Sequence, residues 1–355
     1  MSKKTISPAP TKKGFNLAAF SKSRDLLFGI ATVMVIIFHS YLSFDSLLPS
    51  APVVADILNL VRTHCNKGVD MFLFMSGIGL YYSMSSNPAL KDFYKKRAVR
   101  ILPPVLIVSA IWFAIKGSSG LGNYISNVTL LSFYTKGTRN FWYFSLIVVL
   151  YAVYPFIHKF YKKSGVAGFL LSVFFILMIN FLLMKAAPSV YLNIEIALTR
   201  IPVFLFGCFA AKYVKEGVTI SSKWLIIAAA LTIGIYVLYF YMPLDEGKFL
   251  YLYRYIGSIF AVSQLTLWAA LFEKTKRGGF ATFLVWIGGY SMEIYLIHEK
   301  AASILYNSFH TNDPSKIAFY IAIAVVTIIT AIALKAICLN LEKNLFFRNS
   351  GNKKP

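Results

Sequence analysis

Apolar residues gather along the chain in long runs that short polar connections separate. Ten runs can be recognised, at positions 24–44, 69–87, 101–116, 141–158, 165–184, 195–212, 223–242, 253–272, 281–306 and 316–339. Most of these runs are close in length to the roughly 20 apolar residues that an α-helix needs to cross a bilayer core of about 30 Å. Because a bilayer offers no water to an unpaired backbone group, a helix is the expected form of each run. The pattern predicts an all-α, polytopic integral membrane protein with about ten transmembrane helices.

The runs follow one another without a polar region large enough to form a soluble domain. We therefore predict a single membrane domain at 24–340. Basic segments flank it at 1–23 and 341–355, and we expect both to be cytoplasmic tails, the first of them disordered. No small-residue cleavage site follows the first run, so we expect that run to be a retained helix and not a signal peptide.

Lysine and arginine alternate between the two sides of the predicted bundle. The tails and the connections after the second, fourth, sixth and eighth runs are basic, for example at Lys95 and Lys96. The opposite connections hold acidic residues, namely Asp45, Asp56, Asp245, Glu246 and Asp313. Because cytoplasmic loops carry the excess of basic residues, both termini are predicted to be cytoplasmic, as an even number of spans requires.

Composition agrees with this prediction and removes one alternative. The 355 residues are 57% hydrophobic and only 14% charged, against about 25% charged in a soluble protein. The formal net charge of +22 would suit a nucleic-acid partner, but the basic residues are divided among many loops and form no single basic face. We therefore expect a multi-pass protein of a cell membrane that contacts lipid and no nucleic acid.

Two ionisable residues in the first two runs are candidates for catalysis. His39 lies near the end of the first run and Asp70 near the start of the second, so the predicted topology places both in the outer half of the membrane. Ionisable groups inside such runs are expensive and often functional. The pair suits a general base with an orienting carboxylate. Alternatively, His39 bonds a neighbouring helix and Asp70 caps its own; the residues alone leave both interpretations open.

A basic stretch on the opposite side, FYKKRAVRILPP at 93–104, is a candidate phosphate site. Arg97 and Arg100 are three apart and share a helix face. Their guanidinium groups could hold a phosphorylated ligand by paired hydrogen bonds. An ordinary cytoplasmic loop that touches lipid headgroups is the alternative, and composition alone favours it.

Near the C-terminal end, WIGGYSMEIYLIHE at 286–299 combines a glycine pair with two ionisable residues. The glycines favour close packing of helices. Glu293 needs a partner inside its apolar run, and Arg200 is one candidate. His298 is five residues further on and falls on a neighbouring helix face.

The aromatic residues and the cysteines give weaker indications of function than the charged motifs. In RNFWYF at 139–144, Trp142 and Tyr143 suit either an interfacial belt or a platform for a sugar ring, and the belt is the usual role of such residues. The three cysteines lie far apart and have no metal-ligand spacing, so no metal is expected.

Read in order, these motifs resemble the acyltransferase 3 family of integral membrane acyltransferases. The matching stretches are FHS (38–40), GVDMFLFMSG (68–77), FYKKRAVRILPP (93–104), FWYF (141–144), RIPVFLFGC (200–208) and IGGYSMEIYLIHE (287–299). The resemblance implies transfer of an acyl group, expected to be acetyl, from cytoplasmic acetyl-CoA to a hydroxyl of a cell-surface glycan or a lipid-linked sugar. It also implies a bacterial plasma membrane as the location.

The resemblance also implies roles for individual residues. His39 matches the first-helix histidine that the family uses in catalysis, and Asp70 matches the aspartate of its GVDxF motif. The RxxR motif, here Arg97 and Arg100, is expected to contact the CoA. We further expect the acceptor to be contacted by Trp142, Tyr143, Glu293 and His298.

One position departs from the family pattern. The family usually has an arginine eleven residues before the histidine, where this chain has Phe28. Arg24 lies one turn earlier on the same face and could supply the charge, or it could extend to the lipid headgroups. The departure keeps open a polysaccharide or lipid-linked sugar transporter without acyl-transfer chemistry, and a catalytically inactive scaffold.

Overall fold

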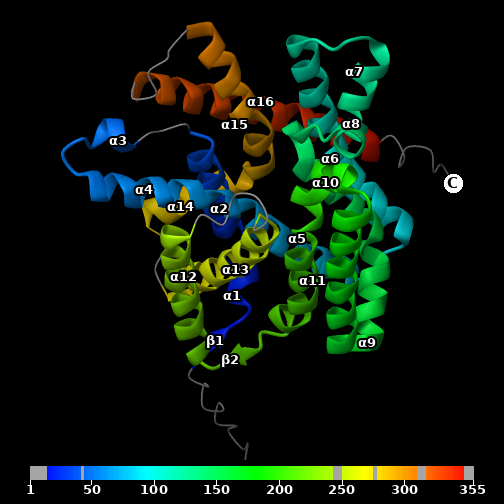
Figure 1. Ribbon diagram of the computed structural model, residues 1–355. Coiled ribbons are helices and arrows are strands. Elements are labelled where there is room, and N and C mark those ends of the chain that lie inside the picture. The colour runs from blue at the N-terminus through cyan, green and yellow to red at the C-terminus, as the bar shows by residue number, and fades with distance from the viewer. Residues whose placement is uncertain (1–13, 41–43, 243–249, 275–277, 310–316, 348–355) are drawn as a thin grey trace, which may run out of the picture.

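The chain folds into a bundle of helices with one very short sheet (Figure 1). The computed structural model describes residues 14–40, 44–242, 250–274, 278–309 and 317–347. Its elements are β1 (Phe15–Asn16), α1 (Ala19–Lys22), α2 (Arg24–Phe38), α3 (Phe44–Leu47), α4 (Pro52–His64), η1 (Cys65–Lys67), α5 (Gly68–Met84), α6 (Leu90–Lys116), α7 (Leu121–Val128), α8 (Leu131–Lys136), η2 (Arg139–Phe141), α9 (Trp142–Ala186), α10 (Pro188–Leu198), α11 (Ile201–Lys215), β2 (Thr219–Ile220), α12 (Lys223–Tyr241), α13 (Leu250–Lys274), α14 (Gly279–Gly289), α15 (Ser291–Phe309) and α16 (Ile317–Phe347). The predicted all-α membrane fold is confirmed.

In the described part of the chain, six helices are long and apolar enough to cross a membrane, or seven if the bent pair α14–α15 is one span. The predicted number of ten spans is larger than this number because α2 and α5, with 15 and 17 residues, are shorter than a usual span. In addition, α9 contains two of the predicted runs, which meet at Gly165, where φ is 53°. The number ten and the cytoplasmic termini stay predictions.

Two predicted runs are broken in the structure, and both breaks shape the centre of the bundle. The run at 195–212 divides into α10 and α11 at Thr199 and Arg200, and Pro202 lies in the first turn of α11, where its missing N–H costs nothing. The run at 281–306 divides into α14 and α15, which are bent by 81°. Polar side chains at these breaks therefore lie inside the bundle and not along the wall of a straight helix.

The predicted tails are shorter than the sequence suggested. Residues 14–22 form β1 and α1, and β1 pairs antiparallel with β2. Phe15 and Phe20 are buried, so apolar contacts hold this segment against the bundle. At the other end, α16 extends to Phe347. Residues 1–13 and 348–355 lie outside the described residues.

Glycines bring two pairs of helices into backbone contact. On α5 and α11, a Cβ on Gly77 would meet the carbonyl oxygen of Phe204, and one on Gly207 would meet that of Phe74. On α2 and α14, a Cβ on Gly288 would collide with the carbonyl of Asp25. The packing role predicted for Gly288 is thus present. These contacts hold α5 against α11 and α2 against α14 in the core, where the functional side chains lie.

We expect Gly207→Val to destabilise the protein, because its side chain has no room against the backbone of α5. Overpacking of this kind costs about 1–3 kcal/mol, and more where the obstacle is backbone. Thermal unfolding in detergent should show a lower Tm. Gly234→Val is the matched control, because a Cβ at Gly234 on α12 meets nothing within 4 Å. Equal Tm values for the two variants would contradict the close α5–α11 contact.

Candidate active site

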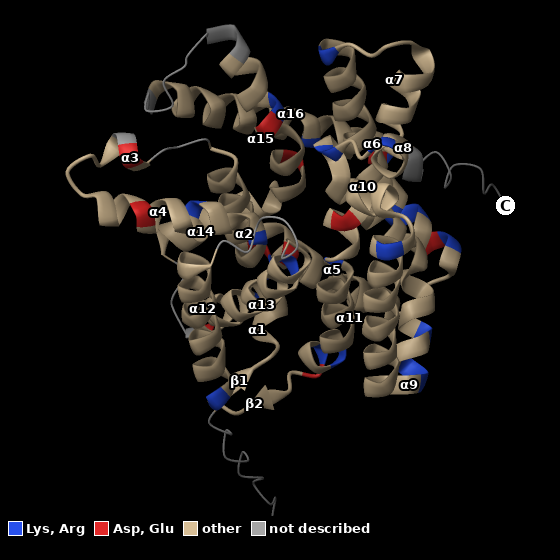
Figure 2. Cartoon of the chain, viewed as in Figure 1, with Lys and Arg blue, Asp and Glu red and all other residues tan. Residues whose placement is uncertain are grey.

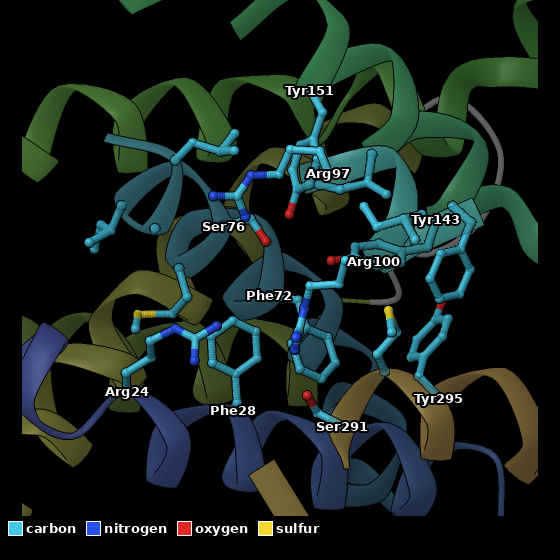
Figure 3. Close-up of a pocket in the computed structure, with 18 of the residues that line it drawn as sticks. Arg24, Phe28, Phe72, Ser76, Arg97, Arg100, Tyr143, Tyr151, Ser291 and Tyr295 are labelled. Atoms are coloured by element: carbon cyan, nitrogen blue, oxygen red, sulfur yellow. The ribbon is translucent and has the colours of Figure 1, made fainter. Parts of the chain in front are cut away.

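Three arginines meet at a cavity of about 460 Å³ between α2, α5, α6, α9 and α15 (Figure 3). Arg24 reaches it from the start of α2, and Arg97 and Arg100 reach it from one face of α6. Figure 3 shows the side chains of Arg24 and Arg97 on two sides of the cavity, with Arg100 between them and the aromatic end. The structure therefore brings together all three residues that the sequence predicted for donor binding.

The charge of this cavity is only partly compensated. Arg24 pairs with Asp25 at 2.8 Å, but both side chains are about half exposed, at 51% and 52%. The Arg24 guanidinium lies 4.7 Å from the ring centroid of Phe28, the residue at which the chain departs from the family pattern. Arg97 Nε is buried without a hydrogen-bond partner among the described residues. Guanidinium groups whose charge is only partly compensated suit a phosphorylated ligand.

Aromatic rings close the cavity at the end away from Arg24 (Figure 3). Tyr143 and Phe144 on α9 face Tyr295 on α15, with ring centroids 5.2 Å and 5.7 Å from that of Tyr295. Phe72 on α5 completes the contact, 6.2 Å from Tyr143 and 6.1 Å from Tyr295. We call these four residues the aromatic layer. Tyr143, predicted to contact the acceptor, thus lines the cavity that contains the arginines.

A pair of histidines lies beyond the aromatic layer. The ring of His298 is 5.7 Å from that of Tyr295, and its Nε2 is 3.2 Å from Nδ1 of His39. His39 follows the end of α2, while the bend between α14 and α15 directs the first turns of α15 toward it. Neither histidine lines the cavity, so the layer separates the two sites.

The hydrogen bonds of the pair assign its tautomers. His298 Nδ1 lies 3.1 Å from the Ile294 carbonyl and 3.0 Å from that of Tyr295, so it carries the proton and leaves Nε2 as an acceptor. His39 Nδ1 then carries a proton that it donates to the Val35 carbonyl, 3.0 Å away, and to His298 Nε2. Among the described residues no hydrogen bond involves Nε2 of His39, so its lone pair is available there, which is what a general base needs.

Asp70 does not take part in this arrangement, which corrects the prediction that it orients His39. Its Oδ2 lies 3.2 Å from Arg200 Nε, and its Oδ1 accepts a 2.8 Å hydrogen bond from Ser258. No hydrogen bond joins Asp70 to His39 within the described residues. The alternative, that Asp70 caps its own helix, is not what the structure shows either: Lys67 is the N-cap residue of α5, and the Asp70 carboxylate and Arg200 neutralise each other in the core. The hydrogen bond of His39 to another side chain goes to His298 instead.

We therefore expect Asp70→Asn to reduce stability more than turnover. Breaking a buried ion pair leaves the Arg200 charge uncompensated, at a cost of about 3–5 kcal/mol. Asp25→Asn is the matched control, because the exposed Arg24–Asp25 pair contributes about 0–1 kcal/mol. Tm and turnover per folded molecule should be measured together. An inactive Asp70→Asn protein with wild-type Tm would restore the orienting role that the sequence suggested.

Other predicted site residues lie apart from one another. Glu293 is buried at the start of α15, within electrostatic reach of Lys335 and Arg100, so it belongs to the arginine side of the aromatic layer. Arg200, one candidate partner for Glu293, pairs with Asp70 instead. Trp142 has the Arg200 guanidinium 4.9 Å from its ring centroid. One face of the indole is thus occupied by a protein cation.

Sequence reasoning missed two further groups of charged residues, of which only the first is shown to lie near the histidines. Glu299 lies within electrostatic reach of both imidazoles and pairs with Lys300 at 2.8 Å. Glu195 and Arg254 form a buried ion pair at 2.6 Å. Glu195 is an acidic residue within an apolar run, which is a signal of function or pairing that the sequence did contain. Arg254, its partner on α13, also lies within a predicted apolar run and carried the same signal.

In the part of the chain that the structure describes, no cluster of His, Cys, Asp and Glu has the arrangement of a metal site. A family model described as an acyltransferase domain matches residues 23–336, nearly the whole of the predicted membrane domain. Searches of curated proteins and of solved structures found no significant match.

Proposed function

Because the chain belongs to the acyltransferase 3 family, we propose that this membrane acyltransferase transfers an acetyl group from acetyl-CoA to a hydroxyl of a cell-surface glycan or of a lipid-linked sugar. One observation carries the proposal. The cavity with three arginines and the histidine pair lie on two sides of a single layer of aromatic rings. A donor held on one side and an acceptor held on the other would meet at this layer.

The arginine cavity is the site for the donor. CoA carries phosphates and a diphosphate, which planar guanidinium groups bind through paired, charge-assisted hydrogen bonds. Arg97 and Arg100 project from one helix face, and Arg24 reaches the same cavity from α2. Arg24 would thus compensate for Phe28 at the position where the family usually has its arginine. The flexible pantetheine arm would extend along the cavity toward Tyr143 and Tyr295.

His39 is the general base. Its Nε2 accepts the proton of the acceptor hydroxyl as the oxygen attacks the thioester carbonyl of acetyl-CoA. The new C–O ester bond forms, the C–S bond breaks, and the CoA thiolate recovers the proton. The hydrogen bond with His298 keeps His39 in the required tautomer. The carboxylate of Glu299 stabilises the imidazolium that forms during the step.

An assay that follows a radiolabelled acetyl group from acetyl-CoA to the acceptor tests this proposal. Purified protein in nanodiscs would receive radiolabelled acetyl-CoA and a cell-envelope glycan extract, and label should appear in the glycan. A transporter without acyl-transfer chemistry would move the sugar into vesicles without acetyl-CoA, and a scaffold would not bind acetyl-CoA. Absence of both transfer and acetyl-CoA binding in wild-type protein would overturn the proposal.

A further inference from the structure

A second cavity, of about 390 Å³, adjoins the arginine cavity at its Arg24 end. Ser21 and Arg24 line both cavities, so the two share a wall where α1 meets α2. The other walls of the second cavity come from the start of α2, the end of α13 and one residue of α14, Val285. We call this space the side cavity. The proposed donor site comprises the arginine cavity alone, and the side cavity has no role in it.

The arginine cavity is small for a ligand of the size of acetyl-CoA. Its volume of about 460 Å³ lies in the lower half of the about 300–1,000 Å³ that sites for drug-sized ligands occupy, and acetyl-CoA is larger than such ligands. Figure 3 shows Arg24 at one end of the cavity and Tyr143 and Tyr295 at the other. With the thioester at the aromatic layer and the diphosphate at the arginines, the 3′-phosphoadenosine part of the donor has to extend past Arg24, into the side cavity.

One part of the side cavity suits the adenine base. Leu26, Phe272 and Val285 give it an apolar wall, against which a planar ring can pack. Glu273, at the end of α13, adds a carboxylate that can accept a hydrogen bond from the exocyclic amine of adenine. In the described part of the chain Glu273 forms no ion pair, so this carboxylate is available to a ligand.

Another part of the side cavity suits a phosphate. Lys22 and Ser23 contribute an exposed ammonium group, which forms no ion pair with the described residues, and a hydroxyl. Residues 24–26 at the start of α2 also line the space, and the Ser23 side chain does not cap this helix. Arg24 compensates the charge of Asp25 at 2.8 Å. Because the N–H groups of a first helical turn carry partial positive charge, they add to Lys22 as ligands for a phosphate.

The side cavity lies toward the end of the bundle that is predicted to be cytoplasmic. Figure 2 shows basic residues at the ends of α9, α11 and α12 that lie toward the small sheet. The excess of lysine and arginine assigns this end to the cytoplasm. Helix α1 directly follows β1 of that sheet. A donor that enters from the cytoplasm would thus meet the side cavity before the aromatic layer.

From these observations we infer that the side cavity binds the 3′-phosphoadenosine end of the acyl donor, with Lys22 at the 3′-phosphate and Glu273 at the adenine amine. This inference rests on the proposed acyl transfer for the identity of the donor as acetyl-CoA. It adds a selectivity to the proposed site. An acetyl thioester of CoA binds well, whereas the same thioester on a phosphopantetheine group without adenosine, as in an acyl-carrier protein, binds weakly.

Three matched donors test the side cavity. They are acetyl-CoA, acetyl-dephospho-CoA, which lacks only the 3′-phosphate, and S-acetyl-4′-phosphopantetheine, which has no adenosine. Their dissociation constants would be measured with the full chain in phosphatidylcholine nanodiscs. We expect acetyl-CoA to bind at least about tenfold more tightly than acetyl-dephospho-CoA, because the latter loses a charge-assisted contact. S-acetyl-4′-phosphopantetheine should bind most weakly of the three.

Lys22→Gln is the decisive variant, because the Lys22 side chain is exposed and lines the side cavity but not the arginine cavity. We expect about tenfold weaker binding of acetyl-CoA and unchanged binding of acetyl-dephospho-CoA. Lys22→Arg should retain the preference. Lys223→Gln is the matched control, an exposed cation at the start of α12 that lines neither cavity. The Tm of each variant without ligand verifies that it is folded.

Glu273→Ala tests the adenine contact separately. We expect it to weaken acetyl-CoA and acetyl-dephospho-CoA by the same factor, because both carry adenine. Binding of S-acetyl-4′-phosphopantetheine should not change. Equal weakening of all three donors would contradict a contact between Glu273 and the base.

Equal binding of acetyl-CoA and acetyl-dephospho-CoA to the wild-type protein, or equal weakening of both by Lys22→Gln, would overturn the inference. Adenosine 3′,5′-bisphosphate, which carries no acyl group, separates this result from the proposed function. If it raises the Tm of wild-type protein but not of Lys22→Gln, and no acetyl group is transferred, the side cavity stands and the proposed acyl transfer fails. If acetyl-CoA and acetyl-dephospho-CoA are used with equal kcat/KM, the acyltransferase stands and the side cavity is not part of its donor site.

Discussion

Replacing His39 with alanine should abolish acetyl transfer while leaving acetyl-CoA binding intact. A positioned general base contributes about 10²–10⁴-fold to the rate, and Nε2 of His39 is the lone pair available for that role in the histidine pair. The donor cavity lies on the other side of the aromatic layer and does not include His39. Turnover should therefore fall by at least about a hundredfold, with the dissociation constant of acetyl-CoA unchanged.

Two other histidines serve as comparisons for this variant. His298→Ala removes the acceptor that fixes the His39 tautomer, so we expect a smaller loss of turnover than in His39→Ala. His158→Ala, on α9 next to Tyr81, should leave turnover unchanged because it contacts neither site. Wild-type turnover in His39→Ala would exclude His39 as the base. A His298→Ala protein as inactive as His39→Ala would indicate that the two act as one unit.

The double variant Arg97→Ala with Arg100→Ala should fail in donor binding. Each hydrogen bond between a charged group and its ligand contributes about 1.5–3 kcal/mol, so loss of both side chains should weaken acetyl-CoA binding by more than about a hundredfold. Equilibrium binding of labelled acetyl-CoA in nanodiscs measures this directly. Turnover at saturating donor should fall much less than kcat/KM, because the histidine pair is not altered.

Lys96→Ala provides the matched control for the arginines. Lys96 is an exposed cation next to Arg97 on α6, and it does not line the cavity. Its removal changes the charge of the same helix segment without removing a cavity contact. Equal weakening by Lys96→Ala would indicate general attraction by the basic loop, the alternative that composition favoured. Unchanged acetyl-CoA binding in the double arginine variant would place the donor elsewhere.

Hydropathy predicted the class of fold because long apolar runs have few alternatives to helices in a membrane. It did not predict the breaks at Arg200 and Tyr290, because a break leaves the average hydropathy of a run unchanged. Gly288, Gly289 and Pro202 were visible hints, but such residues also occur in continuous membrane helices. These breaks determine where Arg200 and His298 lie, so the sequence placed both residues less accurately than it placed the helices.

The same limit explains which site residues the sequence grouped correctly. Arg97 and Arg100 share one helix, and helical spacing alone puts them on one face. His39 and Asp70 lie on different helices, and similar depth in the membrane does not determine which faces meet. The structure turns Asp70 toward Arg200 and brings His298 to His39. Contacts between helices depend on packing at glycines such as Gly77 and Gly288, which no local pattern specifies.

The most direct test of the central claim, that donor and acceptor reach one site from opposite sides, uses proteoliposomes of a single orientation. Labelled acetyl-CoA would be supplied only to the face predicted to be cytoplasmic, and a membrane-impermeant acceptor only to the other face. We predict acetylated acceptor in wild-type vesicles and none in His39→Ala vesicles. Product that forms only when donor and acceptor share one face would contradict the two-sided arrangement around the aromatic layer.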